Sequence, residues 1–176
     1  MEFKNTNIDG LCIVDLNKLE DERGFFARVF CKEEFENANL NSNVLQANIS
    51  YNKVAGTLRG MHYQQSPYQE TKFIRCIRGS IYDVVIDLRK TSDTYLQTFG
   101  IELNSDNRKA LFIPKDFAHG FITLQQNTEV LYLSSQSYVP NSEKGIRWND
   151  PKFSINWPVD LSVISEKDAN WADYNI

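Results

Sequence analysis

Two histidines are the residues of this 176-residue chain whose type and setting point most clearly to chemistry. His62 lies in the segment LRGMHYQ (58–64) and His119 lies in IPKDFAHGF (113–121). Histidine exchanges protons near neutral pH, which suits a general base. A histidine metal centre draws several imidazoles from one chain, and no cysteine pair lies beside these two. We therefore expect proton transfer rather than metal ligation, with a satisfied core or surface histidine as the alternative.

Other polar residues join a histidine in one site only if the fold brings them to the same face. Strict strand alternation sends Arg59 and His62, three residues apart, to opposite faces, but Gly60 between them permits a bulge that unites them. Lys72 is either part of the site or a solvated edge residue. Tyr132 lies in an otherwise apolar strand, where a buried hydroxyl needs a partner. The prediction of a site rests on the combination.

Composition favours one soluble domain covering residues 1–176. Hydrophobic residues make up 41% of the chain and charged residues 24%, and the length allows one sizeable core. A net charge of −4 argues against non-specific nucleic-acid binding, although clustered arginines can still bind an anion. Three cysteines without zinc-ligand spacing indicate reduced thiols. No signal peptide or membrane-spanning run is apparent, so we expect a cytoplasmic protein.

Strand-like segments dominate the chain. Residues 71–78 and 81–89 flank a Gly-Ser turn and predict a β-hairpin, in which Asp83 pairs with Arg75 or Arg78 unless it faces a ligand. A short helix is expected at 32–38, and further strands at 10–15, 25–30, 44–51, 97–103, 109–113, 119–124 and 128–135. Many short strands with regular turns predict an all-β jelly roll, whose interior can hold a small ligand.

A series of motifs carries a family resemblance along the chain. In order they are DERGFF (21–26), QAN (46–48), LRGMHYQ (58–64), KFIR (72–75), GSIYDV (79–84), IPKDFAHGF (113–121), LY (131–132), GIRWNDP (145–151), LS (161–162) and SEKD (165–168). With this order and spacing, over roughly residues 10–168, the chain resembles the 4-keto-6-deoxy-sugar nucleotide epimerases, whose best-known type is dTDP-4-dehydrorhamnose 3,5-epimerase.

The resemblance implies a cupin-like jelly roll with a few short helices, without metal or cofactor, that acts as a homodimer on a nucleotide sugar. It implies His62 as the general base paired with Asp168, Tyr132 as the acid across the sugar ring, and Lys72 beside the C4 oxygen. The implied substrate-binding residues are Arg23, Phe26, Gln46, Asn48, Arg59, Asp83, His119 and Tyr138. Among these, Arg59 and the N-terminal Arg23 of the partner subunit would bind the pyrophosphate, Tyr138 would stack on the base, and His119 would pair with Asp83 beneath the sugar.

The chemistry of a 4-keto sugar accounts for these residue types. The C4 ketone acidifies the protons on C3 and C5, and removing one gives an enolate that a cation such as Lys72 stabilises by about 2.7–4 kcal/mol. Returning a proton to the opposite face inverts the carbon, which requires groups such as His62 and Tyr132 on opposite sides. The implied activity is inversion at C3 and/or C5 of a nucleoside-diphospho-4-keto-6-deoxyhexose, most simply dTDP-4-dehydro-6-deoxyglucose.

Two positions depart from the family pattern. Arg28 stands where thymidine-linked members usually carry Glu, which leaves a cytidine or other carrier as an alternative. Leu133 stands where Lys is common, and we interpret it as surface drift or strand packing. Inversion at only C3 or only C5 is a further alternative. The alternatives for the final sugar are rhamnose, another deoxyhexose of a surface polysaccharide, and a sugar of a secondary metabolite.

Three rival functions are weaker. A sugar-nucleotide 3,4-ketoisomerase would resemble Arg-Gly-x-His-x-His, but Gln64 stands at the position of the second histidine. A non-catalytic sugar-binding cupin would lose some of the four implied catalytic residues, all of which are present. A metal-dependent cupin oxygenase needs more histidines than two.

Overall fold

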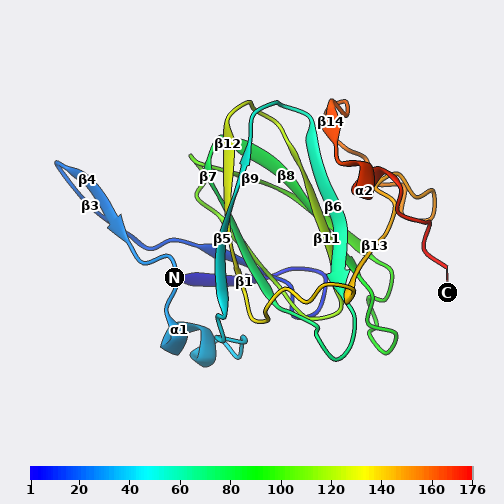
Figure 1. The fold of residues 1–176 in the computed structure, drawn as a ribbon. Coiled ribbons are helices and arrows are strands. Elements are labelled where there is room, and N and C mark those ends of the chain that lie inside the picture. The colour runs from blue at the N-terminus through cyan, green and yellow to red at the C-terminus, as the bar shows by residue number, and fades with distance from the viewer. Residues whose placement is uncertain (176) are drawn as a thin grey trace.

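Two antiparallel sheets face each other in the computed structural model, which describes residues 1–175 (Figure 1). The first sheet has the order β1 (Glu2–Asn5), β2 (Cys12–Asp15), β10 (Ala110–Ile113), β7 (Lys72–Arg78), β12 (Thr128–Ser134), β5 (Gln46–Asn52). The second has the order β13 (Glu143–Gly145), β6 (Thr57–Gln64), β11 (Phe117–Thr123), β8 (Ser80–Asp87), β9 (Thr98–Asn104), and β14 (Val163–Ile164) pairs with β6 in parallel. This sandwich is the predicted cupin-like jelly roll.

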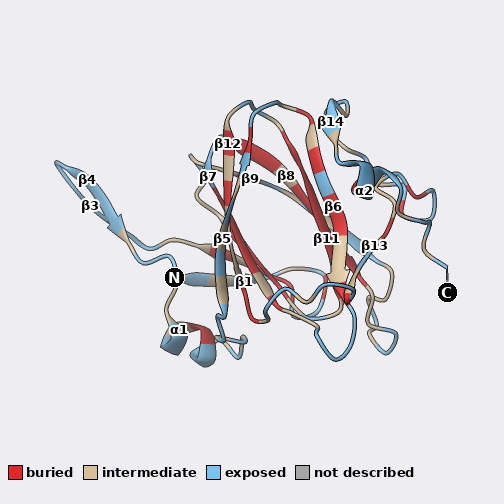
Figure 2. Ribbon diagram, in the orientation of Figure 1, coloured by how far each residue is buried: buried red, intermediate tan, exposed pale blue. Residues whose placement is uncertain are grey.

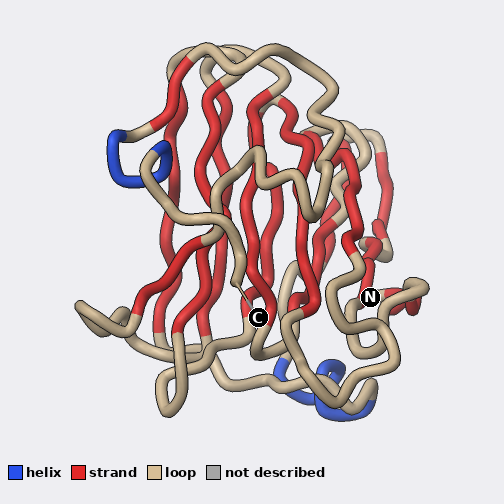
Figure 3. Tube along the Cα trace, turned by 90° about the vertical axis from the view of Figure 1, so that its right-hand side faces the viewer, coloured by secondary structure: helices blue, strands red, loops and turns tan. Residues whose placement is uncertain are grey.

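Apolar side chains that alternate along the strands fill the space between the sheets. The buried residues accordingly lie mostly on the strands of the two sheets (Figure 2). Ile74 and Leu111 of the first sheet pack in one cluster with Val85 and Phe121 of the second. A further cluster lies on the outer face of the second sheet, where the C-terminal segment crosses the strands (Figure 3). The core therefore occupies part of the interior and leaves the rest for polar side chains.

Most of the predicted helices and strands are present, and most of their ends differ from the prediction by one or two residues. The helix expected at 32–38 is α1 (Lys32–Asn37), whose Phe35 is buried against the outer face of the first sheet. The second helix, α2 (Glu166–Ala169), is one short turn at the opposite side of the molecule (Figure 3). Within residues 1–175 no helix has the length and apolar character needed to cross a membrane.

The predicted hairpin of residues 71–89 is wrong. β7 pairs with β10 and β12 in the first sheet, whereas β8 pairs with β9 and β11 in the second. Gly79, at φ +76°, turns the chain from one sheet into the other. Both edges of each strand are already occupied by other partners, so β7 and β8 cannot pair with each other. A Gly-Ser turn between two apolar strands does not reveal this difference, because it is equally suited to a hairpin.

A two-stranded hairpin of β3 (Lys18–Asp21) and β4 (Gly24–Ala27) projects away from the sandwich near the N-terminus (Figure 1). The strand expected at 25–30 thus ends at Ala27 and belongs to neither large sheet. Its apolar side chains face solvent, with Leu19 and Phe26 each 69% exposed. Such a projecting apolar hairpin gains little stability from its own chain.

Candidate active site

A bulge in β6 brings Arg59 and His62 to the same site, as predicted. His62 lies opposite His119 of β11, and Arg59 lies opposite Phe121, so Gly60 and the residue after it face a single residue of the neighbouring strand. Gly60 has φ +137°, and a Cβ there would lie 3.0 Å from the carbonyl oxygen of His119. Only glycine therefore fits, and the extra residue puts both side chains on the inner face.

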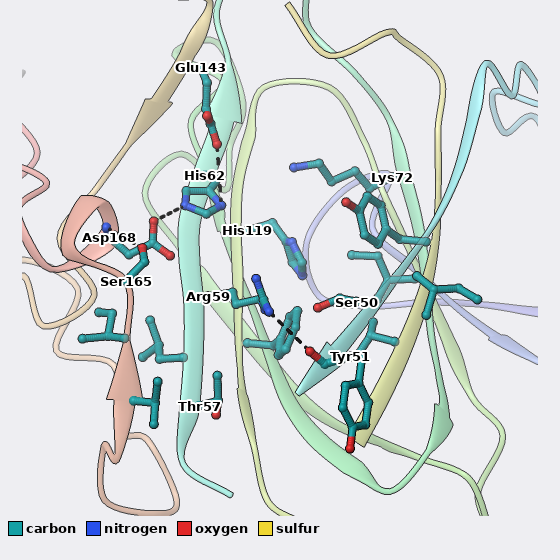
Figure 4. Close-up of a pocket in the computed structure, with 18 of the residues that line it drawn as sticks. Ser50, Tyr51, Thr57, Arg59, His62, Lys72, His119, Glu143, Ser165 and Asp168 are labelled. Atoms are coloured by element: carbon teal, nitrogen blue, oxygen red, sulfur yellow. Dashed lines mark hydrogen bonds and ion pairs between the residues drawn. The ribbon is translucent and has the colours of Figure 1, made fainter. Parts of the chain in front are cut away.

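The inner face at this end of the sandwich encloses a cavity of about 650 Å³ (Figure 4). Both sheets contribute to its walls, and α2 closes one side. The candidate residues among its lining are Arg59, His62, Lys72, His119, Tyr132, Tyr138 and Asp168. Its size lies within the range of sites for small organic ligands. Seven of the twelve residues named from the sequence therefore meet in one cavity.

His62 is held by a carboxylate from α2. Its Nε2 lies 2.6 Å from Oδ1 of Asp168, which is 5% exposed. The backbone N–H of Gly60 donates to the other oxygen of Asp168, and the Ser165 hydroxyl caps the short helix that carries it. Burial raises the pKa of Asp168, but the His62 bond and these neighbours outweigh it and hold the pKa below its usual value. An ionised Asp168 fixes a proton on Nε2, so Nδ1 is the nitrogen left to accept one.

Glu143 is a site residue that the sequence analysis missed. Its Oε1 lies 3.9 Å from Nδ1 of His62, and its other oxygen accepts from the Tyr138 hydroxyl at 3.1 Å and pairs with Lys167. Burial raises the pKa of Glu143, but the hydrogen bond from Lys167 and the charge of His62 lower it by more. The pKa of Glu143 therefore lies below its usual value. Glu143 enters the site because β13 pairs with β6, and no local sequence signal announces that pairing.

The first sheet supplies a tyrosine and a lysine that face His62 from the other side of the cavity. Tyr132 lies on β12 and Lys72 on β7, and the Lys72 side chain points toward His62 (Figure 4). Lys72 is not a solvated edge residue, since its side chain is 15% exposed and pairs with Glu70 at 3.2 Å. Burial raises the pKa of the Tyr132 hydroxyl, with a further contribution from Glu70. Tyr132 is therefore held in its protonated form, as a proton donor must be.

His119 and Asp83 form a second pair deeper in the interior. His119 Nε2 lies 2.8 Å from Oδ2 of the fully buried Asp83. The alternative pairing of Asp83 with Arg75 or Arg78 is wrong, because those arginines belong to the first sheet. The other oxygen of Asp83 has no hydrogen-bond partner among residues 1–175. His119 lines the cavity, whereas Asp83 is outside the lining and reaches the site only through His119.

The remaining candidates surround the cavity unequally. Arg59 is anchored by its Nε to Oδ1 of Asn52 at 2.8 Å and directs its guanidinium into the cavity (Figure 4). Gln46 and Asn48 of β5 line an adjoining cavity of about 220 Å³, which also borders Tyr138. Gln46 accepts from the backbone N–H of Tyr138 at 3.1 Å. The two cavities adjoin, because both are lined by His62, Lys72, Tyr132, Tyr138 and Glu143.

Three N-terminal residues lie apart from this site in the chain. Arg23 and Phe26 belong to the projecting β3–β4 hairpin, where Arg23 pairs with Asp21. Arg28, which departs from the family pattern, donates to Glu34 at 2.9 Å beside α1. A single chain therefore brings no residue of this segment into its own cavity.

The fold and the site define a class of protein: a cupin-like sandwich whose interior holds a histidine–carboxylate pair opposite a tyrosine and a lysine. The family model of dTDP-4-dehydrorhamnose 3,5-epimerase matches residues 5–175. The chain belongs to this family, and it is an isomerase of the epimerase type.

Individual relatives agree over nearly their whole length. A dTDP-4-dehydrorhamnose 3,5-epimerase of Methanothermobacter thermautotrophicus is 43% identical, covering 96% of this chain and 92% of its own. The crystal structure of the Bacillus anthracis enzyme with TDP and PPi bound has a TM-score of 0.95 at 38% identity, covering 98% and 99% of the two chains. A Legionella pneumophila structure in complex with dTDP-4-keto-L-rhamnose gives 0.92 at 35% identity, covering 98% and 92%. A Streptomyces niveus relative, 32% identical over 97% of this chain and 82% of its own, is a dTDP-4-dehydrorhamnose 3-epimerase.

Proposed function

We propose that the cavity converts dTDP-4-dehydro-6-deoxyglucose to the C3- and C5-inverted sugar, with His62 as base and Tyr132 as acid. One observation carries this proposal: the base and the acid come from opposite sheets, so a sugar ring between them has one face toward each. Inversion at carbon needs that arrangement, because the proton must leave from one face and return to the other. Lys72, which points from the first sheet toward His62 (Figure 4), suits the oxygen on which charge develops.

The proton transfers balance with water as the only external proton donor and acceptor. Nδ1 of His62 takes the proton from C3 or C5, and the C–H electron pair moves into the ring carbon–C4 bond while the carbonyl pair moves to O4. Lys72 donates a hydrogen bond to that enolate oxygen, and Asp168 stabilises the imidazolium that forms. The enolate then collapses as the carbon takes the proton of the Tyr132 hydroxyl. A proton from water returns Tyr132 to its starting form, and His62 releases its proton to water.

Contacts outside the ring support a nucleotide carrier. The Arg59 guanidinium, fixed by Asn52, suits one pyrophosphate oxygen pair through its planar fork. Tyr138 is 55% exposed at the rim and is held by Gln46 and Glu143, which suits stacking on a base. We assign thymidine as the base because the family relatives named above are dTDP-sugar enzymes.

Exchange in heavy water tests the assignment. The protein is incubated with dTDP-4-dehydro-6-deoxyglucose in D₂O, and deuterium at C3 and C5 is followed by NMR and mass spectrometry. Incorporation at both carbons, together with the inverted product, is expected. His62→Ala should abolish exchange with an unchanged far-UV circular dichroism spectrum. If no deuterium is incorporated with either the dTDP-linked or the CDP-linked sugar, the proposal is refuted.

Single-site inversion is the second candidate, since a 3-epimerase is among the relatives. The same experiment separates the two functions, because a single-site enzyme incorporates deuterium into product at one carbon. Tyr132 is needed in both cases, since inversion at one carbon also requires a proton on the face opposite His62.

We further propose a homodimer in which Arg23 of the partner subunit reaches the pyrophosphate. The outer face of the first sheet supports this, because Ile49 and Tyr51 of the edge strand β5 are 64% and 46% exposed there. Arg75, on the same face, is 6% exposed and its Nη2 has no partner within residues 1–175. A second copy would cover the apolar side chains and supply an acceptor.

Complementation tests the contribution of Arg23 in trans. Arg23→Ala and His62→Ala each give a weak or inactive homodimer, whereas a mixed dimer would hold one site with both residues intact. The two variants are mixed, unfolded together and refolded, and activity should then recover. Light scattering should give the mass of two chains. Absence of recovery despite mixed dimers would place Arg23 in its own chain's site.

The cytoplasm is the compartment we propose. All three cysteines are free, and two of them are buried away from any oxidant. The nucleotide-sugar substrate also favours this compartment, because its charged pyrophosphate prevents it from crossing a membrane unaided.

A further inference from the structure

Glu70 is a buried carboxylate beside the cavity for which the reaction above has no role. It lies just before β7 and borders the smaller cavity together with Lys72, Tyr132 and Ser134. Its side chain is 13% exposed, and its Oε1 lies 3.2 Å from Nζ of Lys72. The other oxygen accepts a hydrogen bond from the Ser134 hydroxyl.

The two contacts join neighbouring strands of the first sheet. Ser134 of β12 lies opposite Lys72 of β7 in the register of the sheet, and Glu70 links their side chains. Ser134 is itself fixed, because its hydroxyl oxygen accepts from the backbone N–H of Gln136. A lysine side chain has several rotatable bonds and loses about 2 kcal/mol of rotamer entropy when it is ordered. Glu70 provides the fixed anchor that orders this one.

We propose that Glu70 is a positioning residue, which holds the Lys72 ammonium at the height of the sugar carbonyl and places a negative charge beside Tyr132. The inference rests on the proposed epimerase reaction, in which Lys72 meets the enolate oxygen and Tyr132 returns the proton. Glu70 itself does not touch the reacting atoms. Its effect on the rate passes through the two residues that do.

The charges around Tyr132 make this role measurable. Burial raises the pKa of Tyr132 most, Glu70 and Glu143 raise it further, and Arg59 lowers it. His62 and Lys72 line the same cavity. Removing the negative charge of Glu70 lowers the pKa of Tyr132, so the hydroxyl loses its proton at a lower pH. The alkaline limb of the kcat profile should move to lower pH accordingly.

Two substitutions separate the anchor from the charge. Glu70→Gln keeps the shape and a bond to Ser134 but removes the charge, whereas Glu70→Ala removes both. Glu102→Gln is the matched control, because Glu102 also accepts from a serine hydroxyl, at 2.9 Å from Ser80, but lies outside both cavities. All three are compared with the wild type by kcat, KM and pH profile, with folding checked by circular dichroism.

We expect Glu70→Ala to lower kcat about 10- to 100-fold with little change in KM, since misplacing a catalytic group by about 1 Å can cost about 100-fold. Glu70→Gln should recover part of that loss, and the alkaline limb should lie at lower pH in both variants but not in Glu102→Gln. If Glu70→Ala does not fold, the alkaline limb of the kcat profile of Glu70→Gln tests the positioning role by itself.

A purely structural Glu70 would leave the alkaline limb in place, and that result overturns the inference. A loss confined to KM overturns it as well. Failure of the wild type to exchange deuterium would refute the epimerase reaction itself, whereas a wild type that exchanges normally beside unaffected Glu70 variants refutes the positioning role alone.

Discussion

Replacement of Asp168 by Asn tests the histidine–carboxylate pair most directly. The amide is nearly the same size as the carboxylate, so the backbone contacts of α2 and the volume of the cavity are retained. What changes is the charge 2.6 Å from Nε2 of His62. Because Asp168 acts on the proposed base rather than on the substrate, we expect the loss in kcat and little change in KM.

The size of the loss follows from two terms. A hydrogen bond to a charged group is worth about 1.5–3 kcal/mol, and each 1.36 kcal/mol is tenfold in rate. Loss of imidazolium stabilisation alone therefore lowers kcat about 10- to 150-fold. The amide can also donate to Nε2, which moves the ring proton to Nδ1 and blocks the base. The equivalent change in a serine hydrolase triad costs about 10⁴-fold, so we expect a loss between about 10² and 10⁴.

The assay measures deuterium exchange and product formation separately under saturating substrate. Glu166→Gln is the matched control, since it removes a charge from an exposed position of the same short helix. A kcat for Asp168→Asn within about threefold of the wild type, less than the weakest hydrogen bond considered above, would refute the role of the pair.

Three further changes have definite expected results. Tyr132→Phe should slow product formation about 100- to 10,000-fold. Deuterium exchange catalysed by His62, on the opposite face of the sugar, should persist, and NMR measures the two rates separately. Asp87→Asn should lower the free energy of unfolding in urea by about 2 kcal/mol at pH 7, because bonds from Arg89 and two hydroxyls hold the pKa of Asp87 at about 2 against burial. That stabilisation is present above the unfolded pKa of about 4 and is lost as pH falls toward 2, so variant and wild type should converge there. Gly60→Ala should lower the melting temperature and kcat together, since its Cβ meets the backbone of Gly120 at φ +137°; an unchanged melting temperature would contradict the bulge.

The sequence predicted those site residues whose placement depends on local geometry. Gly60 is a local signal, and it correctly predicted the bulge that unites Arg59 with His62. The alternation of β8 likewise put Asp83 on an inward face, where it meets His119. The family resemblance, rather than spacing, linked Asp168 to His62 across 106 positions of the chain.

What the sequence did not predict depends on pairing between distant strands. Glu143 reaches His62 only because β13 joins the edge of β6, and Glu70 reaches Lys72 and Ser134 only because β7 lies beside β12. The error at the β7–β8 corner has the same cause. A strand's own residues define its two faces, but the identity of its neighbours is a property of the whole sandwich.

The division of the proposed base and the proposed acid between two sheets also affects how this fold can diverge. His62 and its carboxylate depend on contacts within the second sheet and α2, whereas Tyr132 and Lys72 depend on contacts within the first. A substitution that alters proton return can therefore arise on one sheet without disturbing the residues that remove the proton on the other. One scaffold can therefore serve both single and double inversion, and the relatives of this chain include a 3-epimerase beside 3,5-epimerases.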